Sequence, residues 1–351
     1  MNQFSTRCAC LIPIALLFFV APHATGGLII NIQAGSTLAS NAAATAAFDR
    51  AANRWEALFS DDVTVNIDAD LQNLGNPSTI GQASSRLLSG SYTTIRNAMV
   101  ADAADEPSNI IVASLPTAAQ ASFILPAGFG ISGSMIATKA NLKGLGFAGL
   151  DAMFGNRDAQ ITFNSTFSFD FDNSDGISGS AMDFEAVATH EIGHALGFVS
   201  IVDGIDSLIN DNQTAPDVPP MPLDLFRFGP TADPETTAEF MSNPRDLRPG
   251  VAAFFDDLST EYLFSTGVTQ GDGRQASHWK DNDLTGILIG IMDPTFAFGQ
   301  AIPISAADIQ ALDFIGWDQV AAVPEPSIAG FSAVALLVFA GIKRRRIFRC
   351  W

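Results

Sequence analysis

The stretch that decides the fold is HEIGHALGF, residues 190–198. His190 and His194 are four residues apart, so on an α-helix both imidazoles project from one face, about one turn apart. Glu191 follows the first histidine and can reach a water on a metal held by both histidines without being a ligand itself. We therefore predict a buried helix from about residue 182 to 198, with Gly197 nearly in line with the two histidines at its end.

The cysteines limit the kind of metal site that this chain can build. Residues 1–26 read as a secretory signal peptide: a basic residue, an apolar stretch and then small residues. Removing it takes away Cys8 and Cys10, and the remaining cysteine, Cys350, lies in the C-terminal tail. The exported domain is then free of cysteine, so disulfides are excluded and any metal must be held by nitrogen and oxygen.

The chain is strongly acidic, with a formal net charge of −19 at pH 7. Six of its 18 basic residues lie in the predicted signal peptide and tail, so the central region is more acidic still. Such a surface repels nucleic acid and other anionic polymers. We expect no nucleic-acid partner.

The C-terminal end, residues 323–351, has three parts in a fixed order. VPEPS (323–327) is followed by an apolar run (328–342) and then by KRRR (343–346). The run is short for a bilayer span, which needs about 20 residues. The tail resembles the PEP-CTERM sorting signal of Gram-negative bacteria. The resemblance implies export to the cell envelope or extracellular matrix, transient membrane retention, and removal by an exosortase-type enzyme; a plain single-pass anchor is the alternative.

Apolar periodicity predicts a mixture of strands and helices around the motif. Strands are predicted at 28–32, 63–71, 109–114, 131–138 and 161–171, and helices at 41–59 and 91–101. After the motif, residues 199–277 are rich in Pro, Asp and Gly and predict an irregular excursion with a short helix near 234–242. A last helix is expected over 305–317, capped by Ser305. The predicted fold class is therefore a mixture of helices and strands, α/β in the broad sense and α+β in the narrower one.

The third ligand is less obvious than the first two. A catalytic zinc takes three protein ligands and leaves one position for water. Ten residues after His190, where the short form of this motif places a third histidine, stands Ser200. Outside the signal peptide and the motif, the one remaining histidine is His278, which we predict as the third ligand. Asp203 or another aspartate is the alternative.

A methionine in a turn context follows this histidine. GIMDP (290–294) contains Met292. The motif, the long insertion, His-Trp at 278–279 and this turn together resemble the leishmanolysin-like branch of the metzincins and bacterial PEP-CTERM metalloproteases, over about 160–320. The resemblance implies a metzincin-like zincin with a twisted mixed sheet, an N-terminal subdomain (27–198) with the central helix, and a C-terminal subdomain (199–322). It also implies that Met292 forms a hydrophobic floor beneath zinc; an ordinary core position is the alternative.

Together these features predict an exported zinc endopeptidase with a polypeptide substrate and one catalytic Zn²⁺. Glu191 would act as general base, accepting a proton from the zinc-bound water and delivering it to the leaving amine. Neutral imidazole ligands need acceptors for their other ring nitrogens, and Asp281, Asp283 and Asp293 are candidates by residue type. Two alternatives remain: an envelope or matrix protein with a structural metal site, and a zinc hydrolase of non-peptide substrates.

An acidic segment lies before the motif helix. Asp170, Asp172, Asn173 and Asp175 are close in sequence, but their spacing does not fit an EF-hand. A Ca²⁺ site and a solvated turn are both open readings of this segment.

Overall fold

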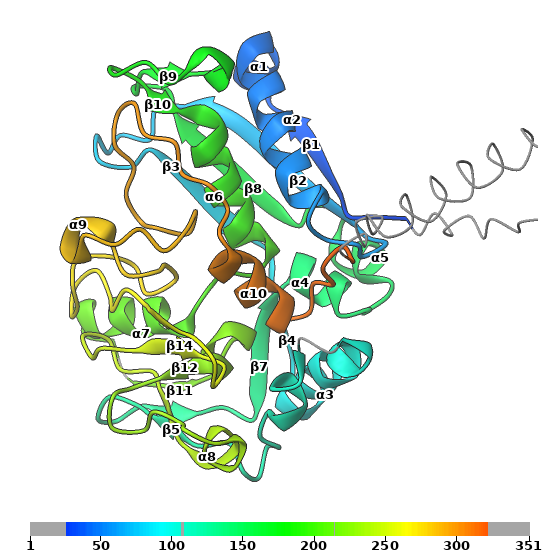
Figure 1. Cartoon of the computed structure of the whole chain (residues 1–351), viewed down its shortest axis with the longest axis vertical. Helices are drawn as coiled ribbons and strands as arrows, with labels where there is room; N and C mark the ends of the chain where they lie inside the picture. The colour runs from blue at the N-terminus through cyan, green and yellow to red at the C-terminus, as the bar shows by residue number, and fades with distance from the viewer. Residues whose placement is uncertain (1–25, 107–108, 214, 322–351) are drawn as a thin grey trace, which may run out of the picture.

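The structure is a computed structural model that describes residues 26–106, 109–213 and 215–321 (Figure 1). The predicted tail over 323–351, with its apolar run, and nearly all of the predicted signal peptide lie outside these ranges. Within them, no single helix is long and apolar enough to cross a membrane. The helices Phe184–Leu196 and Ile201–Asn210 pass that test only as a pair bent by 92°.

The N-terminal half is built on a four-stranded sheet with the order β1-β2-β8-β3. Its strands are β1 (Ile29–Ala34), β2 (Thr64–Gln72), β8 (Ala159–Asn164) and β3 (Gly81–Ser85). The first three are parallel, and β3 is antiparallel to β8 at the edge. In β2 every second residue, from Val65 to Leu71, is buried, as the predicted alternation requires. The sheet is therefore mixed, with an antiparallel edge.

Two helices lie side by side across one face of this sheet (Figure 1). They are α2 (Ala42–Glu56), capped by the Asn41 side chain, and the motif helix α6 (Phe184–Leu196). Trp55 of α2 is fully buried, and its Nε1 donates to the carbonyl of Thr189 on α6 at 2.9 Å. The motif helix is buried along almost its whole length, so the predicted central position is confirmed.

The rest of the chain forms short elements around this layer. Two small sheets join residues that are far apart in sequence. One contains β5 (Phe123–Ile124), β13 (Arg245–Asp246), β12 (Arg227–Phe228), β14 (Phe254–Asp256) and β15 (Glu261–Leu263), and the other contains β6 (Gly130–Ile131) and β11 (Asp217–Val218). One hydrophobic cluster runs from Leu28 to Trp317. The two predicted subdomains therefore share one hydrophobic core, and strands β5 and β6 of the first pair with strands β13 and β11 of the second.

The remaining elements are short. They are α1 (Ser36–Ala39), β4 (Leu87–Ser91), α3 (Tyr92–Asp102), β7 (Ser134–Thr138), α4 (Lys139–Gly144), α5 (Leu150–Phe154), β9 (Phe169–Asp170), β10 (Met182–Asp183), α7 (Ile201–Asn210), α8 (Thr237–Ser242), α9 (Asn282–Thr285) and α10 (Ala306–Phe314). The mixture of helices and sheets confirms the α+β fold class. The helices predicted near 91–101, 234–242 and 305–317 are present, and Ser305 caps the last of them.

Three local predictions were wrong. Residues 109–114 are turns and a 3₁₀ turn rather than a strand; Ile110 is 75% exposed, so this apolar run is not a buried ladder. The strand predicted over 161–171 stops at Asn164, whose side chain accepts hydrogen bonds from the amide and hydroxyl of Thr166 and thereby forms a turn. Finally, α7 lies where an irregular excursion was expected.

Candidate metal centre

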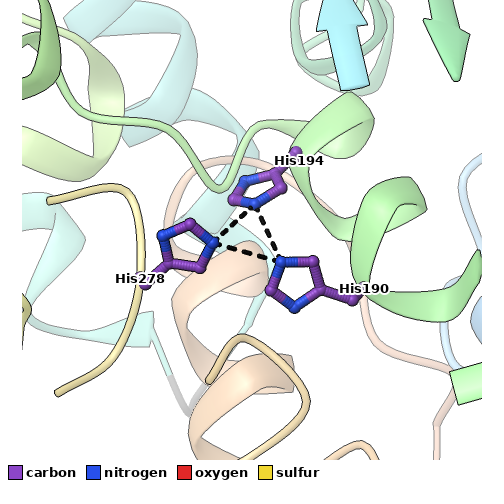
Figure 2. Close-up of side chains that lie close together, drawn as sticks. All are labelled: His190, His194 and His278. Atoms are coloured by element: carbon purple, nitrogen blue, oxygen red, sulfur yellow. Dashed lines mark hydrogen bonds between the residues drawn. The ribbon is translucent and has the colours of Figure 1, made fainter. Parts of the chain in front are cut away.

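Three histidines converge on one point in the interior (Figure 2). His190 and His194 come from α6, and His278 comes from the loop that precedes Trp279. The three Nε2 atoms lie 3.1 Å from one another. Two nitrogens bound tetrahedrally at Zn–N distances of about 2.0–2.1 Å would be about 3.3 Å apart. The triangle of nitrogens is therefore close to the size that one such ion requires.

The other ring nitrogens fix the tautomer of each histidine. The Nδ1 atoms of His190 and His194 lie 2.7 Å from the carbonyl oxygens of Ile291 and Phe198. Nδ1 of His278 lies 3.1 Å from the carbonyl of Gln275. A carbonyl oxygen only accepts, so in a neutral ring the proton is on Nδ1 and Nε2 keeps its lone pair. The three lone pairs face one another, which is the arrangement that a cation stabilises.

The acceptors on these histidines are backbone carbonyls, so the predicted aspartate acceptors were wrong. Asp281 instead accepts from Thr295 Oγ1 at 3.0 Å and from the Asp283 amide at 2.8 Å. Asp293 accepts from the amide of Asn282 at 2.9 Å. These carboxylates shape the loop between the third histidine and the methionine turn.

Burial keeps the three imidazoles neutral. Removal from water lowers the pKa of His190 to about 3 and that of His194 to about 4. Burial and the two neighbouring histidines place the pKa of His278 well below its usual range. A ligand must have its lone pair free, so neutral rings at neutral pH favour metal binding.

Gly197 ends α6 and turns the chain out of the helix. Its φ is +128°, in the region that favours glycine. A Cβ at this position would be 2.9 Å from Ile315 Cδ1 and 3.1 Å from Asn141 Cβ. This sharp turn brings the Phe198 carbonyl back to His194 Nδ1, and Gly197 ends the motif helix as predicted.

Met292 packs against the helix between its two histidines. The side chain is fully buried, and a Cβ at Gly193 would lie 2.4 Å from Met292 Sδ. Gly193 therefore leaves room for the methionine side chain. This contact accounts for a glycine in the middle of a helix, which costs about 1 kcal/mol relative to Ala.

Asp308, on α10, organises the turn that carries Met292 and was not found from the sequence. Its buried carboxylate accepts from the amides of Ile291 at 2.8 Å and Met292 at 3.2 Å, and from Trp279 Nε1 at 2.8 Å. It also completes the capping box with Ser305. One carboxylate thus joins α10, the methionine turn and the residue next to His278. The detectable signal was the Ser-x-x-Asp spacing at 305–308.

Asp203, the alternative third ligand, does not join the histidines. It lies in the first turn of α7, and its carboxylate oxygens accept from the amides of Ala276 at 2.6 Å and Ser277 at 3.0 Å. Ser200 caps α7 and donates to Asp224 at 2.6 Å, and its amide donates to Ser277 Oγ at 2.9 Å. These contacts hold the backbone immediately before His278.

Glu191 is buried beside the edge strand. Glu191 is only 6% exposed, and burial raises the pKa of its carboxyl to about 8. A Cβ at Gly81, the first residue of β3, would lie 2.7 Å from Glu191 Oε1. The carboxylate therefore lies directly against the start of β3.

Carboxylates gather elsewhere as well. Asp233, Asp256 and Glu261 offer oxygens within 4.8 Å of one another. In the acidic segment before α6, Asp170 accepts from the Ser178 amide at 2.9 Å and Asp172 from the Ser174 amide at 3.2 Å. Those two carboxylates stabilise their own loop, and a Ca²⁺ site there stays a prediction.

Comparisons with protein-family models, curated proteins and solved structures found no match. The geometry of the site and the sequence motifs are therefore the basis for a function of this chain.

Proposed function

We propose that this chain is a zinc-dependent endopeptidase. The observation that carries the proposal is the convergence of three neutral Nε2 donors, 3.1 Å apart, with Glu191 directly after the first of them in α6. Three protein nitrogens around one ion leave a fourth position for water, which is typical of catalytic zinc; structural zinc sites usually have four protein ligands. Glu191 supports catalysis further, because a structural site has no use for a buried carboxylate beside it.

The division of work follows from where each group lies. A bound zinc ion would polarise the scissile carbonyl and bring the pKa of its water towards 7. His190, His194 and His278 would hold the ion, and Glu191 would accept the proton of its water and pass it to the leaving amine. Burial raises the pKa of Glu191, and the positive charge of a bound ion would lower it again, so that the ionised carboxylate would be available to accept the proton. The histidines stay neutral throughout, since their Nδ1–H groups remain bonded to carbonyls.

The edge strand supports a polypeptide substrate. β3 pairs with β8 on one side, and no other strand pairs with it in the part of the chain that the structure describes. An extended peptide can add to such an edge through main-chain hydrogen bonds. The Glu191 carboxylate lies against Gly81 at the start of β3, so a peptide bound there would pass close to the proposed base.

The finer assignment is a metzincin-like zincin exported to the cell envelope or extracellular matrix. Two features support it: the buried Met292 packed against α6, and the long segment between His194 and His278. Export rests on the predicted signal peptide, and exosortase-type processing on the predicted PEP-CTERM-like tail. A structural metal protein without activity is the competing function.

Casein hydrolysis by the purified protein tests the proposal. Activity should disappear when a chelator removes the metal and return on addition of Zn²⁺. A Glu191→Gln variant with full zinc content serves as the matched control. A zinc-loaded, folded protein that cleaves neither casein nor gelatin would support the structural alternative.

A further inference from the structure

Three carboxylates from two separate segments meet at a β-hairpin, separate from the histidines. Asp256 ends β14 and Glu261 begins β15, and the two residues are paired directly across the hairpin. Asp233 comes from the loop before α8. Each of the three offers an oxygen, and these oxygens all lie within 4.8 Å of one another. We name these three residues the hairpin acidic group.

The negative charge of this group has no counter-charge nearby. Like charges directly opposite each other destabilise an antiparallel strand pair, and Asp233 adds a third charge to Asp256 and Glu261. Among the described residues, no Lys or Arg forms an ion pair with any of the three. Burial first, and then Asp233 and Glu261, raise the pKa of Asp256 to about 7. The arrangement is therefore unfavourable unless protons or a cation neutralise it.

Buried oxygens of the hairpin acidic group lack donors. Asp256 is 2% exposed; its Oδ1 accepts from the Leu258 amide at 2.6 Å, and no donor in the part of the chain that the structure describes reaches its Oδ2. Asp233 Oδ1 is buried and also has no hydrogen-bond partner. Unpaired buried acceptors are costly and rare in folded proteins. The missing partner of both carboxylates is therefore a donor or a cation.

A pocket connects the group with solvent. It has a volume of about 170 Å³, and Asp256 and Glu261 line it together with Glu235, Ser259 and Thr260. The lining is mostly polar. One water takes up about 30 Å³ in the liquid, so the pocket has room for an ion and several of its waters. The nearly buried Asp256 carboxylate thus borders a space that a hydrated cation can enter.

We propose that the hairpin acidic group binds one divalent cation with the ligand preference of Ca²⁺, held by Asp233, Asp256 and Glu261 and completed by water. Every unpaired group here is an oxygen acceptor, and Ca²⁺ takes about six to eight oxygens, carboxylates and waters among them, in flexible geometry. The ion cross-links the loop before α8 to the hairpin. The chain after β15 reaches Ser265, whose amide donates to the His278 carbonyl at 3.0 Å, so the cross-link stabilises a segment next to the third histidine.

Thermal unfolding with and without Ca²⁺ tests the site. The purified full-length protein is freed of Ca²⁺, kept at a fixed Zn²⁺ concentration and titrated with CaCl₂ at pH 8, with NaCl at matched ionic strength as the control for screening. Tm should rise by on the order of 5 °C at saturation, because a ligand that binds only the folded state stabilises it. Terbium provides a direct probe, since Tyr262, next to Glu261, can sensitise its luminescence and added Ca²⁺ should displace it.

Two variants locate the response. Asp256→Asn should abolish the Tm shift and the terbium signal. Without Ca²⁺ it should unfold at a temperature no lower than the wild type, because the amide oxygen can still accept from Leu258 and the repulsion with Asp233 and Glu261 is removed. Asp172→Asn, in the acidic segment before α6, should respond as the wild type does. A wild type that responds to CaCl₂ no more than to NaCl, or a response lost in Asp172→Asn and kept in Asp256→Asn, overturns the proposal.

Discussion

Individual side chains around the histidines have separable tasks. The histidines present lone pairs because their Nδ1–H groups are bonded to carbonyls, and Glu191 lies beside them without being part of the triangle of nitrogens. Met292, from the turn at 290–294, packs against α6 between the two motif histidines. Substitutions at these positions should therefore separate metal binding, proton transfer and packing.

Glu191→Gln should keep the fold and the zinc but lose peptide hydrolysis. The amide is isosteric and removes only the proton acceptor, whose contribution to rate is typically about 10²–10⁴-fold. Casein turnover and zinc content by atomic absorption check this in the same preparation. Turnover close to that of the wild type would exclude Glu191 as the base.

Met292→Leu should have a mild effect. The volumes are similar, and swaps of this kind usually cost less than about 1.5 kcal/mol. The midpoint of urea unfolding measures the cost, and zinc content should be unchanged. Complete loss of zinc would show that Met292 does more than fill the space left by Gly193.

At the scale of elements, carboxylates connect the C-terminal segments to the site. Asp203 on α7 holds the backbone before His278, and Asp308 on α10 holds the methionine turn and the Trp279 indole. Both act through backbone amides or an indole, so their effect on the metal is indirect. Groups that orient ligands in this way typically change metal affinity by about 10–100-fold.

Asp203→Asn should weaken zinc binding, whereas His278→Ala should remove most of it. The asparagine can still accept one hydrogen bond but cannot accept from both the Ala276 and Ser277 amides, so the loop before His278 loosens while the ligand remains. Competition with a chromogenic zinc chelator measures both affinities. An equal loss of zinc affinity in the two variants would support Asp203 as a metal ligand.

The sequence predicted the site better than the segments around it. HEIGHALGF constrains the geometry strongly, because residues four apart on a helix lie on the same face. His278 was the one histidine left, outside the signal peptide, to join the first two. The acceptors on the histidines were mispredicted because backbone carbonyls carry no sequence signature. The strand predicted at 161–171 failed because alternation continues through the turn at Asn164, and α7 was missed because its Asp and Gly resembled a loop.

At the scale of the whole molecule, the predicted signal peptide and tail lead to a prediction about where the domain is located. Mature protein recovered from the envelope or medium should lack both the signal peptide and the tail, since the ordered motif, apolar run and basic cluster of residues 323–351 resemble a cleaved sorting signal. Mass spectrometry of the released protein checks this. Peptides from Lys343–Trp351 in that form would refute processing, and an intact protein found only in membranes would indicate a simple anchor.

The stability of the whole domain should depend on pH in a way that the buried groups define. Asp61, Glu106 and Glu191 have folded pKa values of about 8 against unfolded values of 3.8 to 4.5. Between these values the folded protein holds protons that the unfolded chain has released, so the free energy of unfolding falls as pH rises. His190 and His194 have the opposite effect, because their folded pKa values lie below the unfolded value of 6.5. They make the free energy of unfolding rise with pH, and this rise is complete once pH exceeds about 6.5.

The interval from about pH 6.5 to 8 therefore isolates the carboxyl groups. Urea unfolding of the metal-free protein should show the free energy of unfolding decreasing steadily across it, and Asp61→Asn should reduce the slope by removing one of the protons involved. The free energy of unfolding decreases because buried carboxyl groups ionise without a neighbouring positive charge to stabilise them. Stability that stays constant or rises between pH 6.5 and 8 would mean that these carboxylates are already ionised and neutralised by other groups in the folded protein.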